Sequence, residues 1–355
     1  MDSAHLVALT RTFRGRTVAV IGDIVADEFV YGRVARVSRE APVLILEYDS
    51  SAVVPGSAGN AANNVAALGG AATLVSIIGR DDPGRRLTEA LHARVNVRKL
   101  VRATGVETTK KTRILAGGIH SAKQQVVRID RVVRKTVPRD ARAAFERSAI
   151  EAARRADALL LSDYGGGLAT PALAARIRTE LRRIEHPIPI LVDSRYRLLE
   201  YRNLTACSPN ESQVEQALGI RINDDLRLLE RAGREILERT AMQAVVITRG
   251  SRGMALFVRD TATMHIPIHG SDEIADVTGA GDTVMATLTL ALSAGATFEA
   301  AARLANYAGG LVVMKRGTAT VSGDELRVAI AGASLSRRSG KERSTAKADG
   351  RDTDE

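Results

Sequence analysis

The sequence predicts an α/β fold, a doubly wound, mostly parallel sheet flanked by helices, with a small projecting β lid. Short runs of Val, Ile, Leu and Ala alternate with segments of helical periodicity along almost all of the 355 residues. Most of these runs are continuous, as expected for strands that helices cover on both faces. Because strand and helix alternate, the strands are expected to be parallel, with ligands bound beyond their carboxyl ends.

Strands are expected where the apolar runs are shortest and richest in β-branched residues. They are Thr17–Ile21, Ala72–Ile78, Ala158–Ser162, Ile188–Val192, Leu204–Cys207, Ala244–Thr248 and Met254–Val258. Helices are expected between and after them. They are Ala58–Leu68, Arg85–Arg94, Arg139–Arg154, Pro171–Ile184, Asp224–Arg239, Gly281–Ser293 and Phe298–Met314.

Two segments, Glu28–Asp49 and Thr108–Arg131, break this rhythm because their β-type residues lack helical periodicity. In the second segment Gly117-Gly118 separates two extended arms, so both segments are expected to be hairpins that together form the lid sheet. The lid is thus an insertion in one domain spanning residues 1–333. Residues 334–355 are almost free of apolar side chains and are expected to be a disordered tail.

The composition, 45% hydrophobic and 26% charged, is typical of a globular protein. The sequence contains no run of 18 apolar residues and no apolar N-terminal segment, so we expect neither a membrane span nor a secretion signal. A cytoplasmic protein is expected. The single cysteine, Cys207, lies in an apolar run and is assigned to the core. His265 and His269 alternate with apolar residues around Pro267, which favours an edge strand over a metal site.

The net charge of +10 suggests an anionic partner. Nucleic acid, an anionic membrane and a phosphorylated small molecule would each fit this charge. Aromatic residues make up only 3% of the chain, which leaves few stacking platforms for single-stranded nucleic acid. We therefore expect a small phosphorylated substrate, with no nucleic acid and no membrane as partner.

The segment Asp276–Asp282 has the sequence Asp-Val-Thr-Gly-Ala-Gly-Asp and directly precedes an apolar helical run. A glycine-rich turn that opens a helix leaves backbone N–H groups free to bind an anion. Asp282 is expected to stay ionised near the helix N-terminus and to accept a proton from a hydroxyl group. The alternative is an ordinary glycine turn with an acidic cap.

A cluster of cations on the second hairpin predicts a site for a substrate phosphate. Lys111 and Arg113 are expected to share one face of their strand and Lys110 to lie on the other. Lys123 and Arg128 belong to the same hairpin. The alternative is a solvated face whose charges protect a sheet edge. The sequence has no Gly-x4-Gly-Lys-Ser/Thr loop, so any ATP chemistry has to use the Gly279–Gly281 turn.

The segment Asp276–Asp282 resembles the DTxGAGD signature of ribokinase-type (PfkB) carbohydrate kinases, and Pro55–Gly69 resembles their Gly-Gly…Asn motif. The resemblance extends from about Thr17 to Ile330. Within the family it is greatest to the kinases of D-glycero-β-D-manno-heptose 7-phosphate. The segments that carry this finer likeness are Gly22–Asp27 with Tyr31-Gly32, Glu40–Val43, Lys111–Arg113, Gln124–Asp130, Ser162–Tyr164 and Thr248-Arg249.

The resemblance implies a ribokinase-like fold, ATP and Mg²⁺ as cofactors, and a homodimer formed through the hairpins. It implies that Asp282 is the catalytic base and that Gly279, Ala280 and Gly281 form the anion hole. The substrate-binding residues that it implies are Asp27, Gly56, Asn60, Lys111, Arg113, Gln125, Arg128 and Asp163. The nucleotide-binding residues that it implies are Asn210, Thr248, Arg249, Gly250, Gly253 and Asn306.

The sequence departs from the family pattern at several positions. Ser57 replaces the second glycine of the Gly-Gly pair, which is tolerable if its φ is negative. Gln213 replaces a glutamate linked to magnesium, so the residues that hold the metal stay unassigned. Of two lysines expected in the substrate loops, the one after Tyr164 is lost, and Arg195 stands in place of the other.

The leading hypothesis is a kinase that phosphorylates the heptose 7-phosphate at C1 and gives the 1,7-bisphosphate. No His-x-Gly-His motif of a fused nucleotidyltransferase is present, so a stand-alone kinase is expected. One alternative is a kinase of the same family for another sugar or a nucleoside. The other is a catalytically weak regulator that binds sugar phosphate.

Overall fold

The structure is a computed structural model, and it describes all residues except 1, 118–122, 132–136, 183–186, 271–275 and 334–355. Its centre is a nine-stranded sheet with the order β15-β14-β13-β12-β11-β10-β1-β4-β6. Seven neighbouring strands of this sheet are parallel, namely β6, β4, β1, β10, β11, β12 and β13. The strands β14 and β15 are antiparallel to their neighbours. The sheet strands are β1 (Thr17–Gly22), β4 (Ala71–Val75), β6 (Val95–Asn96), β10 (Ala158–Asp163), β11 (Ile190–Ser194), β12 (Ala206–Cys207), β13 (Ala244–Thr248), β14 (Met254–Val258) and β15 (Met264–Ile266).

Helices cover both faces of this sheet, so the predicted doubly wound fold is confirmed. Val18 and Val20 of β1 belong to one hydrophobic cluster, and Ala19 and Ile21 belong to a second cluster on the opposite face. This division explains why the strand has a continuous apolar sequence. The labelled helices are α1 (Ser3–Arg11), α2 (Ala58–Ala67), α3 (Asp82–Glu89), α4 (Arg139–Ala153), α5 (Pro171–Leu181), α6 (Glu211–Leu218), α7 (Leu226–Thr240), α8 (Ala280–Ser293) and α9 (Phe298–Val312), and a further helical segment covers residues 323–333.

Some local predictions were wrong or missing, and α6 and β6 are among the elements that were not predicted. The strand predicted over Ala72–Ile78 is divided at Ser76, whose buried hydroxyl donates to the carbonyl of Gly22 at 2.6 Å. Beyond this point β5 (Ile77–Gly79) pairs with β7 (Val101–Ala103) in a separate sheet. The helix α1 was not predicted, because most of its residues are exposed or polar and only Leu6 and Thr10 are buried.

Edge strand β15 contains His265 and confirms the edge strand expected there. No helix among the described residues is long and apolar enough to span a bilayer. The expected tail, Gly118 of the expected hairpin turn and Ile184 at the end of an expected helix lie outside the described residues.

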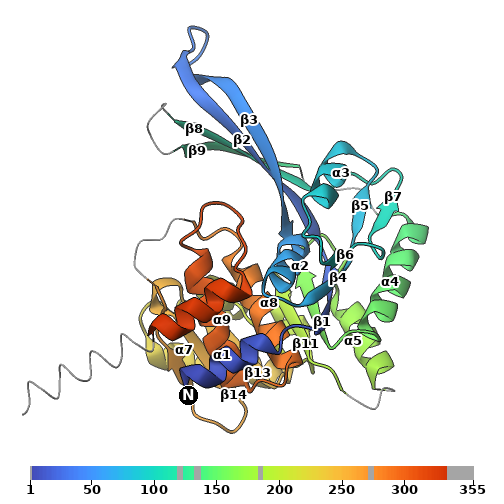
Figure 1. Cartoon of the computed structure of the whole chain (residues 1–355), viewed down its shortest axis with the longest axis vertical. Helices are drawn as coiled ribbons and strands as arrows, with labels where there is room; N and C mark the ends of the chain where they lie inside the picture. The colour runs from blue at the N-terminus through green and yellow to red at the C-terminus, as the bar shows by residue number, and fades with distance from the viewer. Residues whose placement is uncertain (1, 118–122, 132–136, 183–186, 271–275, 334–355) are drawn as a thin grey trace, which may run out of the picture.

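The two predicted hairpins form one four-stranded sheet, hereafter the lid sheet, which projects from the body (Figure 1). The first hairpin is longer than predicted, because β2 (Ile24–Val37) pairs with β3 (Leu44–Ser57) as far as the start of α2. The second hairpin consists of β8 (Lys110–Gly117) and β9 (Gln124–Arg131). Parallel pairing of β2 with β8 joins the two hairpins.

Side chains alternate between the two faces of the lid sheet. On one face, Glu28 binds Arg86 of α3 at 3.1 Å and Lys110 at 2.7 Å. On the other face, Asp27 accepts a hydrogen bond from Arg113 at 2.5 Å. The prediction that Lys110 lies on the opposite face to Lys111 and Arg113 is confirmed, and Asp27, Lys111 and Arg113 of the second face line a pocket.

Candidate active site

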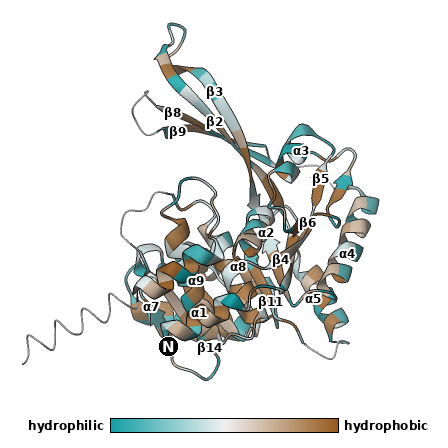
Figure 2. Cartoon of the chain, viewed as in Figure 1, coloured by the Kyte–Doolittle hydropathy of each residue, from teal (hydrophilic) through white to brown (hydrophobic). Residues whose placement is uncertain are grey.

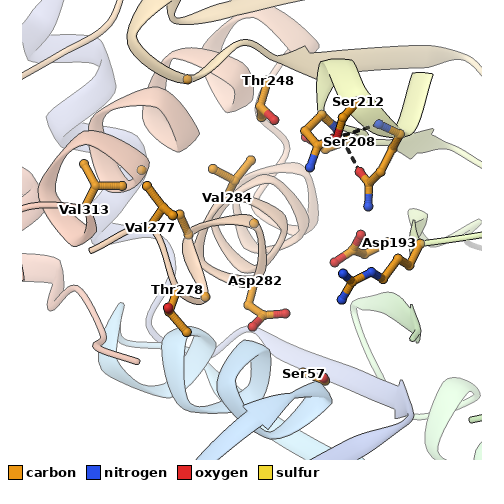
Figure 3. A pocket seen from close by; sticks show the side chains of 18 of the residues that line it. Ser57, Asp193, Ser208, Ser212, Thr248, Val277, Thr278, Asp282, Val284 and Val313 are labelled. Carbon is orange, nitrogen blue, oxygen red and sulfur yellow. Dashed lines mark hydrogen bonds between the residues drawn. The ribbon is translucent and has the colours of Figure 1, made fainter. Parts of the chain in front are cut away.

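A cavity of about 630 Å³ lies beyond the carboxyl ends of the central strands, between the lid sheet and the start of α8 (Figure 3). Asp193 of β11, Ser208 after β12 and Thr248 of β13 line it from the sheet. Asp27, Lys111 and other lid residues line it from the opposite side. The location is the one that a doubly wound sheet predicts for its ligand.

The Gly279–Gly281 turn faces this cavity with backbone N–H groups, of which that of Ala280 already donates to the carbonyl of Val277 at 3.2 Å. Gly279 caps α8 with φ of 80° and without a side-chain hydrogen bond. The first N–H groups of a helix have no intrahelical acceptor. A Cβ atom on Gly279 would lie 2.5 Å from the amide nitrogen of Asn60, so this position requires glycine for its backbone angle and for its contact. An anion in the cavity could therefore bind the start of α8, as predicted.

Asp282 lies in the first turn of α8 and is almost fully buried. Its carboxylate accepts hydrogen bonds from the amide of Asn60 at 2.8 Å and from the hydroxyl of Tyr164 at 2.9 Å. Burial, and next the nearby Asp193, raise the pKa of Asp282 to about 7. The expectation that Asp282 is simply ionised was therefore wrong, because burial and a second carboxylate outweigh the helix N-terminus.

Tyr164 and Asp193 were not predicted as site residues, although each follows or ends a strand at the ligand edge. The Tyr164 hydroxyl lies 3.1 Å from Asp193 as well as 2.9 Å from Asp282. Burial is the main reason that the pKa of Asp193 rises to about 6. The pocket therefore holds two buried carboxyl groups bridged by one phenol. The positions of Tyr164 and Asp193 at the carboxyl ends of β10 and β11 were the signal from which both could have been predicted as site residues.

Asn60 and Gly56 support the pocket but do not line it. Asn60 donates to the carbonyl of Gly279 at 3.2 Å as well as to Asp282, so it fixes the turn and the carboxylate together. A Cβ atom on Gly56 would lie 2.2 Å from a carboxylate oxygen of Asp27, which explains the glycine.

Ser57 follows Gly56 and does line the pocket. Its φ is 54° and its ψ is −126°, in contrast to the negative φ on which the predicted tolerance of serine depended. L-residues rarely adopt this conformation, which costs about 1–3 kcal/mol. The strain arises where β3 turns abruptly into α2, and it holds a serine at the pocket wall.

The lid contributes a group of cations that faces the pocket. Arg113 and Arg128 lie directly opposite each other in β8 and β9, and both line the pocket with Lys111. Burial lowers the pKa of Lys111, and the nearby Arg128 and Arg195 contribute to the same shift. Among the described residues, Lys111 and Arg195 have no ion-pair partner within 4 Å. Like charges at such close range favour the binding of an anion between them.

Other cations of the predicted cluster lie elsewhere. Lys110 faces Glu28, and Lys123 binds Asp49 at 2.6 Å. Gln125 pairs with Leu115 along the lid and does not line the pocket. Asp163 lies below the pocket, where its carboxylate accepts hydrogen bonds from Tyr201 and Ser194, both at 2.9 Å.

The residues expected to bind nucleotide lie mainly at the sheet side of the cavity. Asn210, Thr248, Gly250, Gly253 and Asn306 line it. Arg249 does not, because it is buried and binds Glu211 at 2.7 Å. Apolar and hydroxyl residues of this wall were not predicted. They include Ser208, Met254, Ile268, Val277, Val284 and Val313.

The described residues contain no group of three or more His, Cys, Asp or Glu side chains that could hold a metal ion. Gln213 uses its side-chain oxygen to accept the backbone N–H of Asn210 in a capping box. Mg²⁺ usually keeps several waters and takes further ligands from substrate phosphates. The donor set therefore suits magnesium that arrives bound to nucleotide phosphates, not a cage made by the protein.

A ribokinase-like fold with an anion turn, a buried acid and a cationic lid defines a small-molecule kinase. The model of the pfkB family of carbohydrate kinases matches residues 16–324. The protein named bifunctional protein HldE of Geobacter metallireducens is 40% identical over 332 residues, which are 92% of this chain and 65% of that protein. The protein of the same name from Caulobacter vibrioides is 41% identical over 332 residues, which again are 92% of this chain and 65% of that protein. This chain thus belongs to the pfkB family of carbohydrate kinases, and it spans about 65% of the length of these relatives.

Solved structures confirm the fold. Ribokinase of Arabidopsis thaliana, complexed with ribose and ATP, superposes with a TM-score of 0.68 at 18% identity, covering 89% of this chain and 99% of that one. Phosphofructokinase-2 of Escherichia coli with fructose-6-phosphate gives 0.69 at 18% identity, covering 90% and 99%.

Replacing Asp282 by Asn is expected to stabilise the folded protein at pH 8 by about 1–3 kcal/mol, with little effect at pH 4. An unfolded aspartate ionises near about pH 3.9, whereas Asp282 in the fold has a pKa of about 7. The raised pKa destabilises the fold as the pH rises between these values, and the loss is complete above the folded pKa. Urea unfolding at both pH values measures the effect.

Asp81→Asn is the control of opposite sign. Although burial raises the pKa of Asp81, hydrogen bonds from Thr108 and Gly84 lower it overall. This carboxylate stabilises the fold above the unfolded pKa, so the variant should lose stability at pH 8. If Asp282→Asn also loses stability at pH 8, the result would contradict a raised pKa of Asp282 in the folded protein.

Proposed function

We propose that this kinase transfers the γ-phosphate of ATP to a sugar phosphate, with D-glycero-D-manno-heptose 7-phosphate as substrate and the 1,7-bisphosphate as product. The observation that carries the proposal is the pairing, in one cavity, of a buried acid at an anion turn with a group of cations. Within 4 Å among the described residues, Lys111 and Arg195 have no ion-pair partner, whereas Arg113 and Arg128 each bind one aspartate. Asp282 and Gly279–Gly281 suit the reacting hydroxyl and the γ-phosphate. Lys111, Arg113, Arg128 and Arg195 suit the phosphate that the sugar already carries.

The chemistry follows from these positions. As the sugar oxygen forms its bond to the γ-phosphorus and the bond to ADP breaks, the hydroxyl proton passes to the Asp282 carboxylate. The N–H groups at the start of α8 stabilise the charge on the transferring group. Magnesium bound with ATP supplies positive charge to the phosphates. The apolar wall at Val277, Val284 and Val313 suits the nucleotide base.

A kinase for another sugar phosphate is the second candidate, because one substrate loop lacks a lysine that the family resemblance leads us to expect. Gly166 occupies that position, and a Cβ atom there would lie 2.7 Å from Asp23. Asp23 accepts hydrogen bonds from the backbone N–H groups of Tyr164, Gly166 and Leu168, so this loop cannot take a longer side chain without moving.

Turnover of ATP against a panel of sugars and sugar phosphates tests the proposal. We expect kcat/KM for heptose 7-phosphate to exceed that for the unphosphorylated heptose by at least about tenfold, because one charge-assisted contact contributes about 1.5–3 kcal/mol. Equal turnover of both sugars would contradict the role of the lid cations.

Asp282→Asn is expected to lower kcat by at least about 100-fold, with ATP affinity within a few-fold of wild type, because it leaves the backbone donors intact.

Lys111→Ala is expected to raise KM for the sugar phosphate by about tenfold or more and to leave KM for ATP nearly unchanged. Lys110→Ala is the matched control, because Lys110 is the neighbouring lysine on the opposite face and binds Glu28. Steady-state kinetics with each substrate varied in turn measures both. Equal effects of the two variants, or equal effects on both substrates, would refute the assignment.

We also propose a homodimer formed through the lid sheet, and a cytoplasmic site of action where ATP is available. The ribbon of the lid has brown, hydrophobic stretches in Figure 2. The outer part of the lid exposes large apolar side chains. They are Val34, Val37, Val43, Leu44, Tyr48, Val126, Val127 and Ile129. An exposed apolar sheet is commonly covered by another chain.

Cell fractionation tests the proposed cytoplasmic location. Recovery of the enzyme in the membrane fraction would contradict it.

Ile129→Asp is expected to convert the dimer to a monomer in sedimentation velocity. Val328→Asp is the control, because Val328 is 72% exposed but lies far along the chain from the lid, in a helix. A wild-type protein that sediments as a monomer, or an Ile129→Asp variant that remains dimeric, would contradict this interface.

A further inference from the structure

We propose that Tyr164 and Asp193 are positioning residues that tune Asp282 as the proton acceptor, through a buried chain of hydrogen bonds in which one phenol bridges two carboxyl groups. The inference deepens the proposed function and rests on it. The distances are 2.9 Å from the Tyr164 hydroxyl to Asp282 and 3.1 Å to Asp193. Asp193 thereby acts on the base through Tyr164, whereas Asp282 is the group that takes the sugar proton.

Three separate elements bring these groups together. Tyr164 follows β10, Asp193 belongs to β11, and Asp282 lies in the first turn of α8. The strands are in direct register, with Ser162 opposite Asp193. The backbone N–H of Tyr164 donates to Asp23 at 2.9 Å, which fixes the start of its loop. The backbone of Tyr164 is therefore fixed where its phenol reaches both carboxyl groups.

The phenol has only one hydrogen for its two acceptors. It can donate to one carboxylate at a time, so the other lacks this hydrogen bond unless it binds a proton and donates to the phenol oxygen. Burial and the two aspartates raise the pKa of Tyr164 well above its usual value, so the phenol itself keeps its hydrogen. The two carboxyl groups are thus expected to titrate as a coupled pair.

The other charged groups around the chain make Asp193 the dominant influence on Asp282. Asp27 is also near Asp282, but Arg113 binds it at 2.5 Å and offsets its charge. Asn60, the remaining partner of Asp282, is neutral. Asp163 and Arg195 act on Asp193 in opposite directions, and Asp23 faces the backbone of Tyr164. Asp193 therefore supplies the main like charge, which makes Asp282 a stronger base.

The tyrosine and the aspartate should have opposite effects on the pH profile of kcat/KM. Asp193→Asn removes the like charge, so the acidic limb should move to lower pH by about one unit, and the plateau rate should fall because the base is weaker. Tyr164→Phe removes a hydrogen bond to the carboxylate, so the limb should move to higher pH. The Asp282→Asn variant should lose the limb altogether.

Tyr201→Phe is the matched control. Tyr201 is also buried and donates to an aspartate, Asp163, at 2.9 Å, but neither residue lines the cavity. Its profile should coincide with that of the wild type. Shifts of the same sign in Tyr164→Phe and Asp193→Asn, or an equal shift in Tyr201→Phe, would overturn the proposal. So would an Asp193→Asn variant whose half-saturating magnesium concentration changes while its pH profile does not.

A readout that needs no turnover separates this inference from the proposed function. Carboxyl ¹³C NMR of the isotope-labelled protein without substrate follows the titration of Asp282, assigned from the Asp282→Asn variant. Its midpoint should fall in Asp193→Asn and rise in Tyr164→Phe. If these shifts occur in a protein that turns over no sugar phosphate, the proposed function fails and the coupling stands. Unchanged midpoints in an active enzyme overturn the coupling alone.

Discussion

The structure of this kinase depends on the contact between Asn60 of α2 and the first turn of α8. One amide group donates to the carbonyl of Gly279 and to the carboxylate of Asp282, so it fixes the anion turn and the acid in a single geometry. Gly279 has to be glycine because Asn60 lies where its Cβ would be. Both helices pack in the same hydrophobic cluster, which keeps the contact rigid. Asp282 and the start of α8 are thus placed by regular elements, with the lid as the more exposed part of the site.

The pocket concentrates features that disfavour folding. Two buried carboxyl groups have raised pKa values, and Ser57 has a strained backbone. Such features persist where the surrounding structure over-determines them, and they gather at functional sites. Here the surroundings are two hydrophobic clusters on the two faces of one sheet. The lid carries the opposite sign of charge, which suits a ligand with a hydroxyl group at the carboxyl end of the pocket and a phosphate at the lid cations.

Much of this arrangement could be predicted from local patterns. Continuous apolar runs gave the strands of the parallel sheet, and period-two alternation in β8 placed Lys111 and Arg113 on the face opposite Lys110. The Gly279–Gly281 turn was visible because glycines before a helical run are a local signal. What failed depended on three-dimensional context. The pKa of Asp282 follows from burial beside Asp193, and the role of Asp163 follows from Tyr201, a residue from another segment.

The central claim is that the start of α8 receives the γ-phosphate while the lid cations receive the phosphate of the sugar. A crystal structure with a non-hydrolysable ATP analogue and heptose 7-phosphate tests it most directly. The account predicts the γ-phosphate within hydrogen-bond distance of the Gly279–Gly281 amides, the sugar 1-hydroxyl against Asp282, and the 7-phosphate between Lys111 and Arg195. A sugar phosphate bound away from the lid cations, or a γ-phosphate away from the start of α8, would contradict it.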